Sequence, residues 1–107
     1  MMLLVLDTDG CLNIFDSVDA AQHHLETIDI ENNEYEFCDE SGQPYAGELL
    51  PSRGIFSGDP GFRIVQRGSP DPGLPQSFIN RTKHFWPKGT PFKTLDDACA
   101  YFSRART

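Results

Sequence analysis

The pattern of hydrophobic and polar positions predicts short strands first and then a helix. An apolar run at residues 3–6 is closed by the turn-forming tetrad DTDG at residues 7–10, and a second β-prone run follows at residues 11–15. Two such runs around an Asp-Gly pair predict a β-hairpin. From Ser17 onward the apolar positions recur at spacings of three and four residues. This spacing predicts an amphipathic helix over residues 17–26.

The middle of the chain returns to a period of two. Polar and aromatic residues alternate over residues 34–37, which predicts a half-buried strand. Residues 44–50 can return as its antiparallel partner across a turn at residues 40–43. Residues 51–61 carry three Gly and two Pro and predict a loop. Another strand is expected over residues 62–67.

Two further helices are predicted in the last third of the chain. Pro75 suits the first helical turn, so a helix is expected over residues 76–85, and Pro87 would end it. A variant of the capping box occupies residues 94–97, with Thr first and Asp fourth. The apolar stripe that follows predicts a helix over residues 95–104.

These elements predict a single α+β domain over residues 1–107. We expect a small antiparallel sheet of about five strands in two hairpins, with two or three helices packed on one face. A chain of 107 residues fits one domain, and its 38% hydrophobic residues supply one modest core. No apolar run is long enough to span a bilayer, so no membrane partner is expected. The three cysteines are far apart and form no CxxC pair, which favours free thiols and a cytoplasmic location; they are Cys11, Cys38 and Cys99.

Charge is divided unevenly along the chain. The net charge is −7, but residues 1–59 hold 13 acidic side chains and one basic side chain, whereas residues 60–107 hold three acidic and eight basic. The front half therefore carries −12 and the back half +5. Phosphates would be repelled by the front half, which argues against binding to nucleic acid or an anionic membrane there. A basic protein would be attracted to it.

The acidic segment is the predicted partner-binding surface. Residues 26–40 contain seven carboxylates without a basic neighbour, and unrelieved like charges cost energy unless something neutralises them. We therefore expect a non-enzymatic binding module of the bacterial immunity or antitoxin type, whose basic partner could be a toxin. The alternative is a solvated outer face that the basic back half neutralises. The expected contacts are Glu31, Glu34, Glu36, Asp39 and Glu40, with Glu26 and Asp29 beside them.

The segment at residues 3–12 resembles the first motif of the haloacid dehalogenase-like phosphohydrolases, an apolar strand followed by DxDG. The resemblance implies a parallel Rossmann-like sheet and a magnesium-dependent phosphotransfer, with Asp7 as the nucleophile and Asp9 as the general acid/base. It covers about ten residues of the 107, and the remaining motifs of that family are not found along the chain. The competing interpretation of DTDG is a hairpin turn. We expect no cofactor.

Two further segments carry weaker signals of function, one for metal binding and one for nucleic-acid binding. His23 and His24 are neighbours, so on a helix they point about 100° apart and do not form a metal pair. Basic and aromatic residues interleave over residues 78–93, a composition that can bind single-stranded nucleic acid by charge and stacking. The sequence pI of about 4.7 opposes this alternative, so we expect the aromatic residues of this segment to belong to the core.

Overall fold

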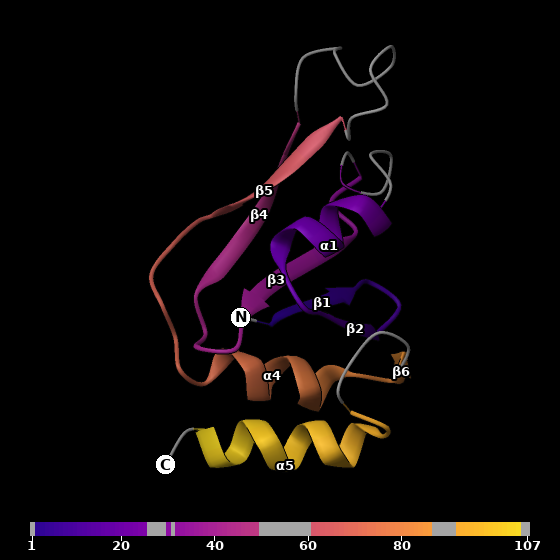
Figure 1. Cartoon of the computed structure of the whole chain (residues 1–107), viewed down its shortest axis with the longest axis vertical. Helices are drawn as coiled ribbons and strands as arrows, with labels where there is room; N and C mark the ends of the chain where they lie inside the picture. Colours follow the sequence, from indigo (N-terminus) through magenta and orange to yellow (C-terminus); the bar gives the residue numbers. More distant parts are fainter. Residues whose placement is uncertain (1, 26–29, 31, 50–60, 87–91, 106–107) are drawn as a thin grey trace.

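The computed structural model describes residues 2–25, 30, 32–49, 61–86 and 92–105, the last three of these for the backbone only. The described elements form one six-stranded sheet and three helices (Figure 1). In chain order they are β1 (Leu3–Asp7), β2 (Cys11–Phe15), α1 (Val18–His24), β3 (Tyr35–Asp39), β4 (Pro44–Leu49), β5 (Phe62–Gln66), α4 (Leu74–Arg81), β6 (His84–Trp86) and α5 (Leu95–Ala105). The α+β class is therefore as predicted.

The strand order across the sheet is β5-β4-β3-β1-β2-β6. Each neighbouring pair is antiparallel except β2 and β6, which run parallel. The sheet is thus mixed and has six strands rather than about five. The two predicted hairpins are present, since β1 pairs with β2 and β3 pairs with β4.

Helices cover both faces of the sheet, which corrects the expectation of one covered face. Leu3 and Val5 pack into the core on the side of α1, together with Ala21 and Leu25 of that helical segment. The other side of the sheet packs against α4 and α5; its core consists of Leu4, Leu6, Leu12, Ile14, Cys38, Phe78, Ile79, Ala98 and Phe102. Strand β1 is therefore buried on both faces, which is the physical reason that its sequence is a continuous apolar run.

Capping hydrogen bonds mark the starts of two helices, α1 and α5. The Ser17 Oγ accepts a hydrogen bond from the Ala20 backbone N–H at 3.0 Å and begins α1. The Thr94 Oγ1 accepts one from the Asp97 N–H at 3.2 Å at the start of α5, as the capping box predicts. Both helices lie within a residue or two of their predicted bounds.

Helix α4 ends at Arg81, four residues before its predicted end. The backbone N–H groups of Lys83 and His84 donate to the Gly10 carbonyl oxygen at 2.7 and 3.1 Å. These contacts draw the chain onto β2, where residues 84–86 form the short edge strand β6. The prediction of a helix through Phe85 was wrong because tertiary hydrogen bonds to the β1–β2 turn replace the helical ones.

The β4–β5 hairpin diverges from the rest of the sheet (Figure 1). Strands β3 and β4 pair only at Phe37 with Tyr45 and at Cys38 with Pro44, whereas residues 45–49 of β4 all pair with β5. The outer edge of β5 is partly covered, since the Ile64 N–H donates to Gln22 Oε1 of α1 at 2.7 Å. All but the last residue of the loop predicted at residues 51–61 lie outside the described residues. No helix in the described part of the chain is long and apolar enough to cross a membrane.

Candidate functional site

The DTDG tetrad forms the tight turn of the β1–β2 hairpin. One carboxylate oxygen of Asp7, Oδ1, accepts the backbone N–H groups of Asp9 and Cys11, each at 2.9 Å. Gly10 closes the turn with a positive φ of 83° and donates its N–H to the Asp7 carbonyl oxygen. Both neighbours of β1 run antiparallel to it, unlike the parallel sheet that the phosphohydrolase resemblance implies. Asp7 thus organises a turn, and its carboxylate is held at a defined position beside Asp9.

Among the described residues, no group of three or more His, Cys, Asp or Glu side chains could hold a metal ion. His23 is exposed, and its Nδ1 lies 2.8 Å from the Asp19 carbonyl oxygen in the preceding turn of α1. His24 is exposed as well, and its ring lies against that of Phe15, with 5.3 Å between ring centroids. The two imidazoles therefore have different surroundings.

Two of the three thiols, Cys11 and Cys38, have raised pKa values. Burial raises the pKa of the Cys38 thiol to about 12. Burial, followed by the neighbouring carboxylates of Asp7 and Asp9, also raises the pKa of Cys11. A thiol attacks as its thiolate, so both groups are held in the unreactive form at neutral pH. All three cysteines, Cys99 included, are free.

Asp39 points into the protein rather than toward a partner. It is 8% exposed, and its Oδ1 accepts hydrogen bonds from the Ser41 N–H, the Ser41 hydroxyl and the Gln43 N–H. The Tyr45 hydroxyl donates to its Oδ2 at 3.3 Å. This carboxylate therefore closes the β3–β4 turn, and the remaining acidic candidates differ from it in exposure.

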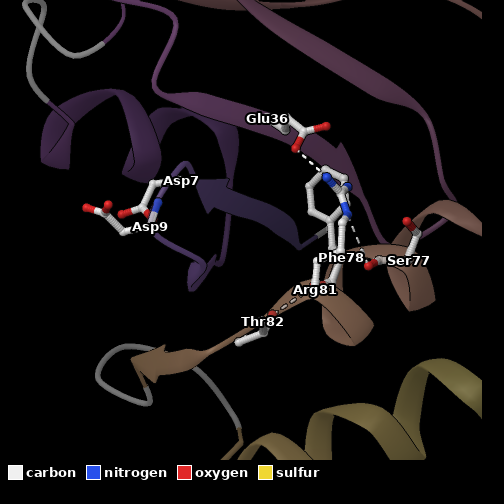
Figure 2. Close-up of polar contacts among 7 residues, drawn as sticks. All are labelled: Asp7, Asp9, Glu36, Ser77, Phe78, Arg81 and Thr82. Atoms are coloured by element: carbon white, nitrogen blue, oxygen red, sulfur yellow. Dashed lines mark hydrogen bonds and ion pairs between the residues drawn. The ribbon is translucent and has the colours of Figure 1, made fainter.

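Glu36 is exposed but has an internal counter-ion. Its Oε2 lies 2.6 Å from Nη1 of Arg81 on α4. Figure 2 shows the Arg81 side chain lying along the Phe78 ring, 5.3 Å from the guanidinium carbon to the ring centroid, and reaching the Glu36 carboxylate. The two side chains are 45% and 58% exposed, so the pair contributes about 0–1 kcal/mol to stability.

Glu40 is also engaged within the fold. It accepts the backbone N–H of Met2 at 3.0 Å and the hydroxyl of Tyr101 on α5 at 3.0 Å. The hydrogen bond from its hydroxyl to Glu40 raises the pKa of Tyr101. Glu31, the fifth predicted contact, lies outside the described residues, as do Glu26 and Asp29.

Glu34 lies beside the hairpin turn that carries Asp7 and Asp9. Its carbonyl oxygen accepts the Thr8 N–H at 3.0 Å, which fixes the start of β3 beside the end of β1. A shallow concavity of about 210 Å³ is lined there by Asp7, Thr8, Asp9, Glu34 and Tyr35. The sheet thereby brings together three acidic residues that are 27 positions apart in sequence at their extremes. The sequence predicted either a pair of catalytic carboxylates or a hairpin turn for Asp7 and Asp9, and neither interpretation connected them with Glu34.

The aromatic residues of the segment at 78–93 have unequal surroundings. Phe78 is buried, and Phe85 and Phe92 pack against the same core cluster. Trp86 is 62% exposed at the edge of the sheet. The stem of Lys83 lies over Gly10, and Lys88 is outside the described residues. The expectation of core aromatics thus describes three of the four.

Trp86 borders a groove on the α1 side of the sheet. Two adjoining cavities, of about 600 and 300 Å³, share Asn13, His24 and Trp86 in their walls. We call this the Trp86 groove; its other polar and aromatic walls come from Asp7, Cys11, Phe15, Asp16 and Tyr35. The groove depends on β6 pairing with β2, so no local sequence signal could have revealed it.

Comparison of the chain with protein-family models, with curated proteins and with solved structures gave no match.

Proposed function

We propose that this protein is a non-enzymatic binding module that recognises a basic protein partner. The observation that carries the proposal is the charge division, 13 acidic and one basic side chain in residues 1–59, together with the gathering of Asp7, Asp9 and Glu34 around one concavity. Clustered carboxylates on a concave surface raise the local concentration of a cationic partner and accelerate its association.

The predicted contact set divides into two groups in this proposal. Glu34 belongs to the acidic concavity, and we add Asp7 and Asp9 to it. Glu31 stays in the proposed set on its sequence position alone. Glu36 can face a partner if an incoming cation replaces Arg81, a modest cost for so exposed a pair. Asp39 and Glu40 serve the fold first, since their carboxylates accept hydrogen bonds from neighbouring segments.

The biological form that we propose is a small bacterial inhibitor of the immunity or antitoxin type. In such a complex the carboxylates would occupy the positions of substrate phosphates on a basic toxin. Its small size and acidity support this form, and three free thiols support action in a reducing cytoplasm. The alternative function is binding of nucleic acid by residues 78–93. The overall negative charge of the chain opposes it.

The proposal is tested with a fluorescein-labelled deca-lysine peptide as the probe. The double variant Asp9→Lys with Glu34→Lys reverses two carboxylates of the concavity. The control, Asp96→Lys with Asp97→Lys, makes the same change in net charge at the exposed start of α5. Affinity is measured by fluorescence anisotropy at low and at physiological salt, and folding is checked by circular dichroism.

We expect the concavity variant to lose at least tenfold in affinity at low salt and the control to lose much less. Each reversal exchanges an attraction for a repulsion of about 1 kcal/mol per contact at the surface. Added salt should shrink the difference. Equal losses in both variants would mean that net charge alone attracts the peptide, and the proposed recognition surface would be wrong.

A further inference from the structure

The Trp86 groove is built by side chains that four strands and one helix bring to the same face. Asn13 of β2 pairs with Val5 on one side and with Trp86 on the other, so the Asn13 and Trp86 side chains lie next to each other on that face. Asp7 pairs with Tyr35 two residues further along β1. Because Val5 is fully buried and Asp7 is not, the groove opens at this end of the α1-covered face.

Its walls combine an exposed aromatic plane with carboxylates. The indole of Trp86 is 62% exposed, and Asp7 lines the same 300 Å³ cavity. Asp16 lines the adjoining 600 Å³ cavity, so each part of the groove has one acidic wall. The Asp7 carboxylate is already oriented, since the Asp9 and Cys11 N–H groups hold its Oδ1. Such a preorganised acceptor loses little conformational entropy when a donor binds.

We propose that the Trp86 groove receives an arginine side chain of the basic partner, with the guanidinium stacked on Trp86 and donating toward Asp7. This inference rests on the proposed function, because it specifies the chemistry of the same partner. A guanidinium is planar, stacks on aromatic rings and donates hydrogen bonds to carboxylates. A lysine ammonium is a compact, strongly hydrated charge and uses the indole plane less well.

Charge decides between a protein and a nucleic acid as the occupant. A base of single-stranded nucleic acid could also stack on an exposed tryptophan. Its phosphates, however, would meet the acidic residues Asp7 and Asp16 of the groove and the acidic residues of the neighbouring concavity, Asp9 and Glu34. An arginine-bearing protein segment meets attraction from the same groups, so the groove favours it.

The test uses Trp86 as its own reporter, because it is the single tryptophan of the chain. Wild-type protein is titrated with deca-arginine and with deca-lysine, which carry equal charge, and the intrinsic fluorescence and the affinity are recorded. We expect deca-arginine to change the Trp86 emission saturably and to bind roughly threefold to tenfold more tightly than deca-lysine. In Trp86→Ala, deca-arginine should bind only as well as deca-lysine, and Trp86→Phe should recover part of the difference.

The outcomes separate this inference from the proposed function. If Trp86→Ala leaves the preference for deca-arginine intact while Asp9→Lys with Glu34→Lys weakens both peptides, the arginine site is wrong and the acidic module stands. If neither variant affects either peptide, both proposals fail. Tight, Trp86-dependent binding of a deca-thymidine oligonucleotide would overturn the arginine assignment in favour of a nucleic acid. Circular dichroism of each variant confirms that the fold is kept.

Discussion

The role of Asp39 can be tested by removing its carboxylate. In Asp39→Ala the donors left without their acceptor are the Ser41 N–H and hydroxyl, the Gln43 N–H and the Tyr45 hydroxyl. Asp39 is 8% exposed, so water has little access to the position that the carboxylate leaves. The turn between β3 and β4 would therefore lose the group that closes it.

The expected loss in the free energy of unfolding is about 3 kcal/mol. A hydrogen bond to a charged group contributes about 1.5–3 kcal/mol, and an unsatisfied buried donor costs about 1–3 kcal/mol. Ser41 is exposed and can turn to water, whereas Gln43 and Tyr45 are half-buried and recover less. The expected loss in the free energy of unfolding therefore corresponds to about one and a half strong hydrogen bonds, although four hydrogen bonds to Asp39 are removed. For a domain of this size, the melting temperature should fall by roughly 10–20 °C.

The measurement is urea denaturation followed by circular dichroism. Asp39→Asn keeps an acceptor at Oδ1 and should lose about half as much as Asp39→Ala. Asp9→Ala is the control, because it removes an exposed carboxylate, and its stability should stay within about 0.5 kcal/mol of the wild type. If Asp39→Ala were as stable as this control, Asp39 would not have the structural role inferred above and would return to the set of partner contacts.

Two further predictions concern the turn and the buried thiol. Gly42→Ala should lose about 2–5 kcal/mol in urea denaturation, because φ is +93° and an added Cβ would lie 1.9 Å from the Asp71 carbonyl oxygen. Gly68→Ala, with φ of +91° and its nearest neighbour at 3.7 Å, should lose only about 1–2 kcal/mol, and equal losses would refute the clash. The raised pKa of Cys38, about 12 against an ordinary 9.0, means that the folded state holds this proton more tightly, so stability should be full below pH 9 and fall between pH 9 and 12. Unfolding free energies at pH 8 and 10.5 should show a smaller alkaline loss in Cys38→Ala, and an aromatic disulfide reagent at pH 8 should modify half-buried Cys99 before Cys38.

Local signals in the sequence determined the elements and the fold class. DTDG predicted the first hairpin because an Asp-Gly turn needs only the residues within it. Ser17 and Thr94 predicted where two helices begin, since a cap satisfies N–H groups two or three residues away. The alternation at residues 34–37 predicted β3 for a similar reason. Each of these signals acts over a few positions along the chain, so the sequence alone contains it.

Long-range pairing decided the arrangement that matters for function. The apolar run at residues 3–6 is compatible with burial on one face or two, and only the placement of α1 opposite α4 and α5 selects two. Helix α4 stops at Arg81 because backbone donors reach a carbonyl more than 70 positions earlier, at Gly10. That contact forms β6 and, with it, the Trp86 groove.

The tertiary structure likewise decided the surroundings of each acidic residue. Neighbouring acidic residues in sequence face different environments, because their partners come from distant elements. Glu36 meets Arg81, 45 positions away, and Asp39 turns inward to its own turn, whereas Glu34 joins Asp7 and Asp9 at the end of the sheet. The sequence alone determined that the front half is acidic. Only the pairing of distant strands and helices decided which of its acidic residues lie side by side.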